Sequence, residues 1–403
     1  MFLTKIKVDP KSLCNKLSIK CFGWGDNWNH GGRFKSSYST SYNQVPSMNQ
    51  TLKDHKPHPQ VVTRPVCRAK ASQSPNGPLA DLTCELLDPF VREADREDRT
   101  EVISTEELCH EIENTNERIR RAGLRTGSFQ QNGKLTVGSM DVDKFYPNMD
   151  IDQTAEEAKL EIIESSVEVK GVNTEEVALY LACSMSQKEI DQEGLTDVVH
   201  RRRSNKGSRP GLTCKAITGG PKIRGEDKSW LPPQKEPTPQ QSNHMLGCLV
   251  KCTVKLVMKN HFYSFNNKIR KQKKGGAIGN SLTEKLAKLL MKRFDRKFKA
   301  LLKKLKIEIE LYRRFVDDII AALKALDAGV RFNEDDMKKE KIHELQESDG
   351  RQAEDKRTFE ELRKIDNTVY KSVQFTTDTP SIHQEETCPV LDLQLQNQVP
   401  ASM

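Results

Sequence analysis

An apolar stretch at residues 312–321, Tyr-Arg-Arg-Phe-Val-Asp-Asp-Ile-Ile-Ala, is interrupted at its centre by two adjacent carboxylates, Asp317 and Asp318. The apolar residues on both sides predict two short buried strands joined by a tight turn. Because Asp favours turns on its own account, a plain Asp-Asp turn is one explanation. A buried carboxylate is costly unless it has a partner such as a metal ion. A further aspartate at another strand end would therefore favour a metal site.

Such an aspartate occurs upstream, in Gly-Ser-Met-Asp-Val-Asp-Lys-Phe-Tyr-Pro-Asn-Met at 138–149. Residues 135–149 are predicted to form a strand that carries Asp141, and Asp143 is the rival candidate because it would share a strand face with Asp141. Three carboxylates from two strand ends can hold two divalent ions, which clamp the attacking and leaving oxygens of a phosphoryl transfer. Mg²⁺ (or Mn²⁺) suits such a site because it takes carboxylate oxygens and leaves positions for phosphate and water.

At these residues the chain resembles the reverse transcriptases, and it is most similar to those of Penelope-like retroelements. The resemblance covers roughly residues 50–395 and rests on blocks in the family's order: Leu-Lys-Asp-His-Lys-Pro at 52–57 with Arg-Pro-Val-Cys at 64–67, then 141–147, 272–283, 312–318, and 374–377 with 390–393. The chain departs from the family after the glycine block. Where the family has Ser-Pro-Leu-Ser-Pro, this chain has Asn-Ser-Leu-Thr-Glu at 280–284.

The resemblance implies an α+β palm-and-fingers polymerase fold, with an antiparallel palm sheet backed by helices. The expected organisation is a poorly ordered extension at 1–45, a fingers-like region at 46–135, a palm at 136–395 and a tail at 396–403. Within the palm, two insertions are expected, a basic and Pro-rich one at about 190–242 and an acidic one at about 327–356. Only a few residues follow the last palm block, so a thumb is expected to be missing.

The resemblance also implies roles for individual residues in template-directed DNA synthesis. Asp141, Asp317 and Asp318 are the implied catalytic metal ligands. The implied nucleotide-binding residues are Lys53, Arg64, Tyr146, Gly276 and Gly279, and the implied nucleic-acid contacts are Gln272 and Ser281. The Tyr146 ring would exclude a 2′-hydroxyl and select deoxynucleotides, and the alternative is an ordinary core tyrosine. The implied partners are an RNA or DNA template, a DNA primer and deoxynucleoside triphosphates.

Composition agrees with an intracellular protein that binds a polyanion. The net charge is +8, and 30% of residues are charged against 35% hydrophobic. The ten cysteines show no zinc-ribbon spacing and no secretory leader precedes them, so they indicate reduced thiols. No apolar run approaches the roughly 20 residues that span a bilayer. We expect an intracellular location, nuclear in a eukaryote.

Several stretches predict local structure. His244, Cys248 and Cys252 follow at four-residue steps on a predicted helix, where a core face is favoured over a metal site. Residues 262–269 predict a hairpin that turns at Asn266-Asn267. A helix is predicted over residues 281–299, and the basic cluster at 201–209 would contact nucleic acid, serve as a nuclear address, or be a solvated loop.

Two alternatives to an active polymerase remain open. One is a truncated or decayed protein of the same fold that binds nucleic acid without catalysis. The other is a structural or interaction protein in which Asp317-Asp318 is only a turn, so that neither metal nor nucleic acid binds.

Overall fold

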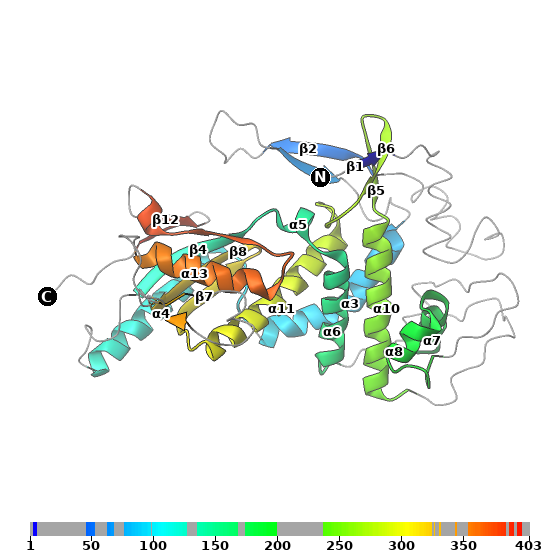
Figure 1. Cartoon of the computed structure of the whole chain (residues 1–403), viewed down its shortest axis with the longest axis horizontal. Coiled ribbons are helices and arrows are strands. Elements are labelled where there is room, and N and C mark those ends of the chain that lie inside the picture. Colours follow the sequence, from blue (N-terminus) through cyan, green and yellow to red (C-terminus); the bar gives the residue numbers. More distant parts are fainter. Residues whose placement is uncertain are drawn as a thin grey trace, which may run out of the picture. The chain divides into compact units, whose positions relative to one another are not determined.

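The computed structural model of the chain divides into two compact units, whose elements are labelled in Figure 1. The helical unit comprises Met1–Glu93 and Met149–Leu290, and the sheet unit comprises Ala94–Asn148 and Met291–Met403. The structure describes residues 3–5, 46–52, 63–67, 76–97, 99–126, 135–167, 174–199, 237–324, 326, 330–331, 343–344, 354–383, 387–390 and 393–396.

The sheet unit is built on a four-stranded antiparallel sheet with the order β11-β4-β8-β7. Its strands are β4 (Leu135–Val142), β7 (Ile309–Phe315), β8 (Asp318–Lys324) and β11 (Phe375–Asp378). The predicted hairpin at 312–321 is confirmed as β7 and β8, which pair from Phe315 opposite Asp318. Residues 319–323 of β8 are all buried, because an inner strand with helices on both sheet faces has no solvated side.

Helices cover both faces of this sheet. On one face, α13 (Glu354–Val369) lies so close to β4 that a Cβ on Gly138 would be 2.9 Å from the Phe359 ring. The same face meets the C-terminal half of α11 (Ser281–Lys304), where the rings of Phe294 and Phe375 lie 4.9 Å apart. Figure 1 views the sheet from the side of α13.

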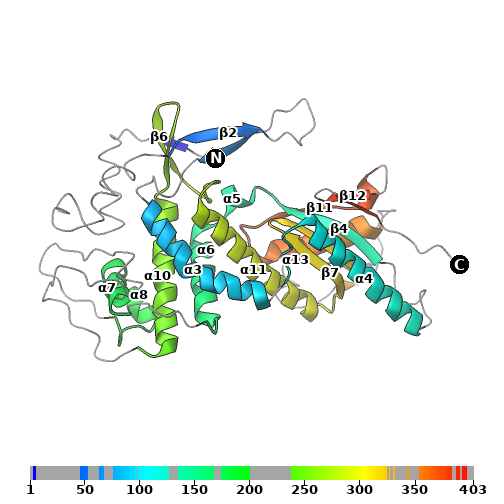
Figure 2. The ribbon, with the colours of Figure 1, turned by 180° about the vertical axis from the view of Figure 1, so that it is seen from behind.

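The opposite face packs against α4 (Thr105–Thr126) and β12 (Thr387–Val390), and α4 is in front in Figure 2. Its core joins Val102, Leu108, Leu311, Ile320, Ala322, Cys388 and Val390. Ser104 caps the start of α4, since its hydroxyl accepts from the Glu107 N–H at 3.2 Å. The unit also holds α5 (Phe145–Asn148), β9 (Val330–Arg331), β10 (His343–Glu344), η2 (Pro380–Ile382) and β13 (Leu393–Gln396).

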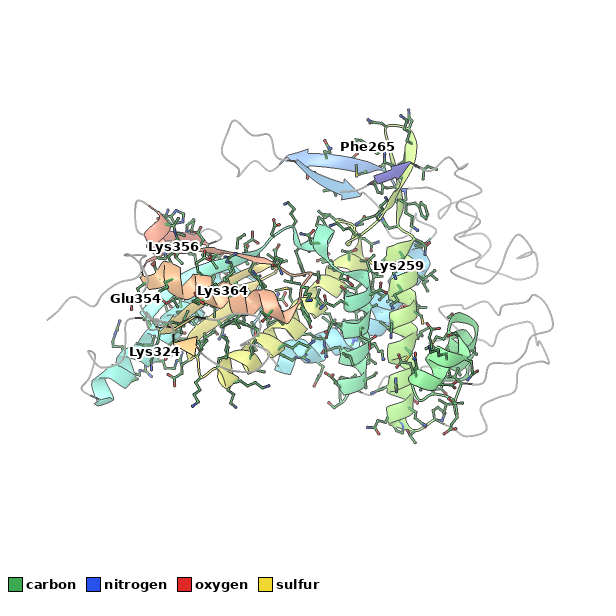
Figure 3. All side chains as sticks on the ribbon, in the orientation of Figure 1. Lys259, Phe265, Lys324, Glu354, Lys356 and Lys364 are labelled. Atoms are coloured by element: carbon green, nitrogen blue, oxygen red, sulfur yellow. The ribbon has the colours of Figure 1, made fainter. Side chains whose placement is uncertain are left out.

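The helical unit is organised around α10 (Pro239–Lys259), which packs along α6 (Ile151–Glu164) and against α7 (Thr174–Ser184). Gly247 allows the close approach of α10 to α6, because a Cβ there would lie 3.0 Å from the carbonyl oxygen of Lys159. Lys259, labelled in Figure 3, adds an ion pair to Asp152 of α6 at 2.8 Å. The short α8 (Gln187–Gln192) follows α7, and α3 (Gly77–Glu97) belongs to this unit up to Glu93.

Two small sheets complete the helical unit. One has the order β1-β6-β5, from β1 (Leu3–Lys5), β5 (Phe262–Phe265) and β6 (Lys268–Gln272), and the other pairs β2 (Met48–Leu52) with β3 (Thr63–Cys67). The predicted hairpin at 262–269 is confirmed, and its turn residues Asn266 and Asn267 both have positive φ, at 49° and 55°. Asn tolerates that conformation, which two-residue hairpin loops require.

One predicted boundary was wrong. The first strand ends at Val142 rather than continuing to residue 149, because Lys144 turns the chain at φ 47° into α5. Asp150 caps α6, and its carboxylate accepts from the Gln153 N–H at 2.7 Å. The block at 390–393 includes the last residue of β12, Val390, and the first residue of β13, Leu393, and these two strands pair antiparallel. β1 lies within the extension expected to be poorly ordered, and the basic cluster at 201–209 lies outside the described residues.

The described helices include none with the length and apolar character needed to cross a bilayer.

Candidate active site

The strands that carry the predicted metal ligands are neighbours in the sheet. In the antiparallel β4–β8 pair, Met140 lies opposite Ile319, and one further step of this register places Asp141 opposite Asp318. Directly opposite residues have Cβ atoms about 4.5–5.5 Å apart. The two aspartates share a sheet face because side chains alternate along a strand. Asp141 is exposed and Asp318 is half-buried, so solvent reaches this strand end.

Asp317 lies in the turn between β7 and β8, beside a residue in an unusual conformation. Val316 has φ 57°, in the left-handed region that a β-branched residue enters only at a cost of about 1–3 kcal/mol. Its side chain is 43% exposed, so burial of the Val316 side chain does not offset that cost. The turn that positions Asp317 is therefore held by other contacts.

One of those contacts comes from Arg314, which is 1% exposed. Its Nη1 donates to the Val316 carbonyl oxygen at 2.6 Å, and its Nε donates to Oδ2 of Asp295 in α11 at 2.9 Å. The Tyr312 hydroxyl donates to the other oxygen of Asp295 at 2.9 Å. Burial raises the pKa of the Asp295 carboxyl, while Arg314 and Tyr312 act in the opposite direction. A buried charge pair thus fixes the aspartate turn to the helix beneath the sheet.

A second buried carboxyl, Asp366 of α13, lies near this pair. It is 0% exposed, and neither of its oxygens has a hydrogen-bond partner. Burial, and then the charge of Asp295, raise its pKa well above the usual range. Burial thus favours the neutral form of Asp366, which places no negative charge beside the Asp295–Arg314 pair.

The two other candidates near Asp141 lie beyond the end of β4. Tyr146 is half-buried in α5, with its ring centroid 5.6 Å from that of Phe145. Asp143 was expected to share a strand face with Asp141, and this was wrong because β4 ends at Val142. Asp143 is exposed, its N–H donates to the Gln374 carbonyl at 2.8 Å, and its carboxylate pairs with Lys144 at 3.6 Å.

The glycine block of the helical unit is a tight loop before α11. Gly279 has φ 93°, a conformation that favours glycine. A Cβ on Gly276 would lie 2.1 Å from Cγ2 of Thr283, so no side chain fits there without displacing α11. Asn280, where the chain departs from the reverse transcriptases, caps α11 by accepting from the Leu282 N–H at 2.9 Å.

The remaining predicted residues belong to the helical unit. Gln272 is 5% exposed, and its side-chain amide donates to the Lys274 carbonyl at 3.0 Å, so it supports the glycine loop. Ser281 is exposed at the start of α11 and hydrogen-bonds Cys84. Arg64 lies on β3 opposite Thr51, and Lys53 is outside the described residues. Contacts of these residues with nucleotide or nucleic acid stay predictions.

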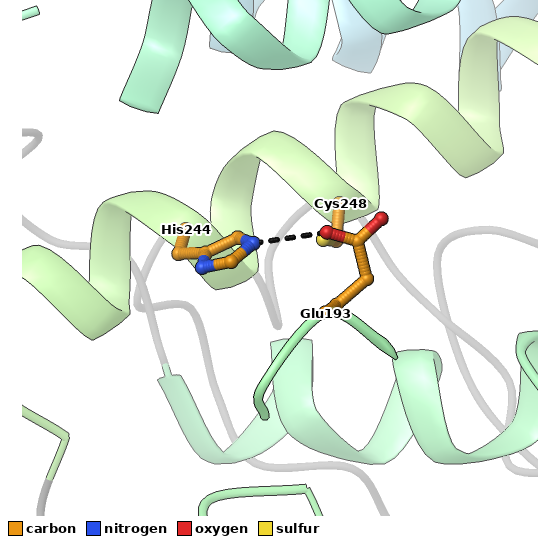
Figure 4. Close-up of side chains that lie close together, drawn as sticks. All are labelled: Glu193, His244 and Cys248. Atoms are coloured by element: carbon orange, nitrogen blue, oxygen red, sulfur yellow. Dashed lines mark hydrogen bonds and ion pairs between the residues drawn. The ribbon is translucent and has the colours of Figure 1, made fainter. Parts of the chain in front are cut away.

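Within the part of the chain that the structure describes, one group of three potential ligands has all its ligand atoms within 4.8 Å of one another, and it is not the aspartates. Glu193, His244 and Cys248 form it in the helical unit (Figure 4). The sequence indicated the helical face of His244 and Cys248 but gave no signal for Glu193, which is 51 residues from His244.

Comparisons with known proteins give likenesses of fold only. No protein-family model matches the chain. No curated protein matches it either. Among solved structures, apo telomerase from Candida tropicalis has a TM-score of 0.42 and 12% identity over 98% of this chain and 55% of that chain. The same telomerase truncated from its C-terminal domain has a TM-score of 0.39 and 12% identity over 96% of this chain and 59% of that chain.

Telomerase from Candida albicans in complex with a fragment of telomeric RNA gives a TM-score of 0.37 and 15% identity over 70% of this chain and 37% of that chain. The chain thus spans between about a third and three fifths of the solved chains it matches. At TM-scores below 0.5 none of these likenesses decides the function.

Proposed function

We propose that the chain is a reverse-transcriptase domain that adds deoxynucleotides to a primer 3′-hydroxyl, of the type found in Penelope-like retroelements. The observation that carries the proposal is the register of β4 and β8, which pairs Met140 with Ile319 and, continued by one step, would set Asp141 opposite Asp318 beside the Asp317 turn. Like charges directly opposite on adjacent strands are destabilising. Three acidic groups at one accessible strand end therefore favour a site built for a cation over a structural role.

The donor set fits the expected metal. Carboxylate oxygens are the ligands that Mg²⁺ takes, and Asp141, Asp317 and Asp318 are the residues that would hold it. Bound there, the metal would lower the pKa of the primer hydroxyl and neutralise charge on the leaving pyrophosphate. The buried Arg314–Asp295 pair would keep the Asp317 turn in place during this reaction, so little reorganisation is needed.

Other residues would serve substrate binding. Tyr146, half-buried at the end of β4, would exclude the 2′-hydroxyl of a ribonucleotide. The backbone at Gly276 and Gly279 would approach a phosphate or template closely because no side chain intervenes. The substrates would be an RNA or DNA template, a DNA primer and deoxynucleoside triphosphates, and the site of action would be the nucleus of a eukaryotic host.

Primer extension on a poly-A/oligo-dT substrate with Mg²⁺ or Mn²⁺ tests the proposal. We expect extension by the wild-type chain and its loss in Asp141→Asn, Asp317→Asn and Asp318→Asn. Asp143→Asn is the matched control, because Asp143 is an exposed carboxylate only two residues from Asp141 but beyond the strand end. We expect this control to retain extension.

Absence of extension by a folded wild-type chain, or equal loss in Asp143→Asn, would contradict the proposal. In the first case, an affinity for single-stranded nucleic acid that falls steeply with salt would support a non-catalytic binding protein of the same fold.

A further inference from the structure

A compact group of charged and metal-ligating side chains lies in the helical unit, on helices that carry none of the predicted catalytic aspartates. Glu193 is the residue that ends α8, and His244 and Cys248 are one turn apart on α10. Nε2 of His244 lies 3.0 Å from Oε2 of Glu193, and the Cys248 sulfur lies within 4.8 Å of both ligand atoms (Figure 4). Oxygen, nitrogen and sulfur donors thus converge on one point.

Two lysines also contact Glu193, which makes a plain ion-pair cluster the simplest alternative. Lys159 of α6 lies 2.6 Å from Oε2 of Glu193, and Lys251 of α10 lies 3.2 Å from Oε1. His244 is the third neighbour of this carboxylate, with Nε2 3.0 Å from Oε2. Glu193 thus lies among three nitrogen donors of neighbouring side chains.

Both lysines have a second carboxylate partner, so neither depends on Glu193 alone for its ion pair. Glu156 of α6 lies 3.1 Å from Lys159 through Oε1 and 2.6 Å from Lys251 through Oε2. One carboxylate can thus hold both ammonium groups, one on each oxygen. If Glu193 turned from the lysines to a metal ion, neither lysine would lose its only anionic partner, so the cost of burying an unpaired charge is avoided.

We propose that Glu193, His244 and Cys248 form a binding site for a thiophilic divalent metal, Zn²⁺. Three protein ligands with a fourth position for water is a common zinc arrangement, and a thiolate with an imidazole favours zinc over Mg²⁺ or Ca²⁺. The Cys248 thiol loses its proton to solvent when its sulfur bonds the metal, and no electron is transferred. The site is independent of DNA synthesis.

The metal would act on stability. It would tie the end of α8 to the first half of α10, two segments joined by a stretch of chain from residue 200 to 236 outside the described residues. A ligand that binds only the folded state raises stability by an amount that grows with the logarithm of its concentration. We therefore expect Zn²⁺ to raise the thermal unfolding midpoint of the full chain.

Titration of the chelator-stripped full chain with Co²⁺ tests this site, because cobalt bound to a thiolate gains a near-ultraviolet charge-transfer absorption. We expect this absorption to appear at an equimolar ratio and to be displaced by Zn²⁺. Cys248→Ser should abolish it, as should His244→Gln, a change at a half-exposed position that serves if the cysteine variant fails to fold. Cys252→Ser, one turn further on α10, is the matched control and should retain it.

Two outcomes would overturn the proposal: no absorption with the wild-type chain, or an absorption that survives in Cys248→Ser. Each would leave Glu193 as the centre of an ion-pair cluster. The readout does not involve nucleotide incorporation, so failure of the metal site and failure of the proposed polymerase activity are distinguishable.

Discussion

Nη1 of Arg314 lies 2.6 Å from the carbonyl oxygen of Val316, so a fully buried guanidinium holds the backbone of the turn that carries Asp317. The other side of the same guanidinium is fixed by Asp295 at 2.9 Å. The strained turn is thereby tied to α11 through the core of the sheet unit. A role for Arg314 in positioning Asp317 can be separated from its role in stability.

Arg314→Met is expected to lower the free energy of unfolding by about 3–5 kcal/mol, because it leaves the Asp295 carboxylate buried without its charged partner. The double variant Asp295→Leu/Arg314→Met removes both charges and should recover most of that loss. Urea denaturation measures both values.

The double variant still lacks the donor to the Val316 carbonyl. We therefore expect it to fold stably but extend primers poorly, with a raised requirement for Mg²⁺. A double variant with the wild-type extension rate and Mg²⁺ dependence would show that Arg314 serves stability alone.

Val316→Asn is expected to raise the free energy of unfolding by about 1 kcal/mol, because Asn adopts positive φ more readily than a β-branched residue. Val316→Ile, which keeps the strain, is the control and should change the free energy by less than half of that. A destabilised Val316→Asn chain would show that the turn is not strained in solution.

The aspartate hairpin could be predicted from sequence because its signal is local. Asp317 and Asp318 interrupt an aliphatic run, and the residues that follow are buried in β8. The helical spacing of Leu286, Phe294 and Phe298 is likewise a local signal, and all three side chains are buried in α11. The register that pairs Met140 with Ile319, next to Asp141 and Asp318, follows only from pairing between strands more than 170 residues apart along the chain, for which no sequence pattern is specific.

The contacts that support the site could not be predicted. Basic residues along an amphipathic helix usually face solvent, yet Lys292 and Arg293 of α11 are only 4% and 5% exposed. Nothing in the spacing of Arg314 and Asp295 indicates that they meet. The first strand was predicted too long because Phe145 and Tyr146 favour strands, while the turn at Lys144 has no sequence signature.

Gly276→Ala is expected to destabilise the helical unit by about 1–3 kcal/mol, because its Cβ would overlap Cγ2 of Thr283. Thr283→Ser removes that methyl group, so the double variant Gly276→Ala/Thr283→Ser should be more stable than Gly276→Ala alone. Denaturant unfolding of the wild-type chain, the two single variants and the double variant gives the coupling energy between positions 276 and 283. Strict additivity of the two changes would contradict the contact.

Tyr146→Ala is expected to increase ribonucleotide incorporation relative to deoxynucleotide incorporation at least tenfold, a difference of about 1.4 kcal/mol in transition-state discrimination. The reason is that a half-buried ring at the end of β4 would no longer exclude the 2′-hydroxyl. Phe145→Leu, at the adjacent buried ring, controls for general loosening of α5. Selectivity that does not change in Tyr146→Ala would leave Tyr146 as a core tyrosine.

The buried carboxyl of Asp366 predicts a dependence of stability on pH. Its pKa in the folded protein lies well above the ordinary 3.8, because the side chain is buried and lies near the charge of Asp295. Above pH 3.8 the folded state therefore retains a proton that the unfolded chain releases. The stabilising contribution of this group is complete below that pH and is lost as pH rises toward the folded-state pKa, by up to about 1.4 kcal/mol per pH unit.

The Asn side chain of Asp366→Asn has the same shape as Asp and no proton to lose. The free energy of unfolding of this variant should therefore lack the pH-dependent contribution of Asp366. We expect the stability difference between Asp366→Asn and the wild-type chain to be small near pH 4 and to grow in favour of the variant as pH rises to 8. Urea unfolding at a series of pH values measures the difference, in which the titration of all other groups cancels. A difference that stays constant across this range would mean that Asp366 has an ordinary pKa and that solvent reaches it in the folded protein.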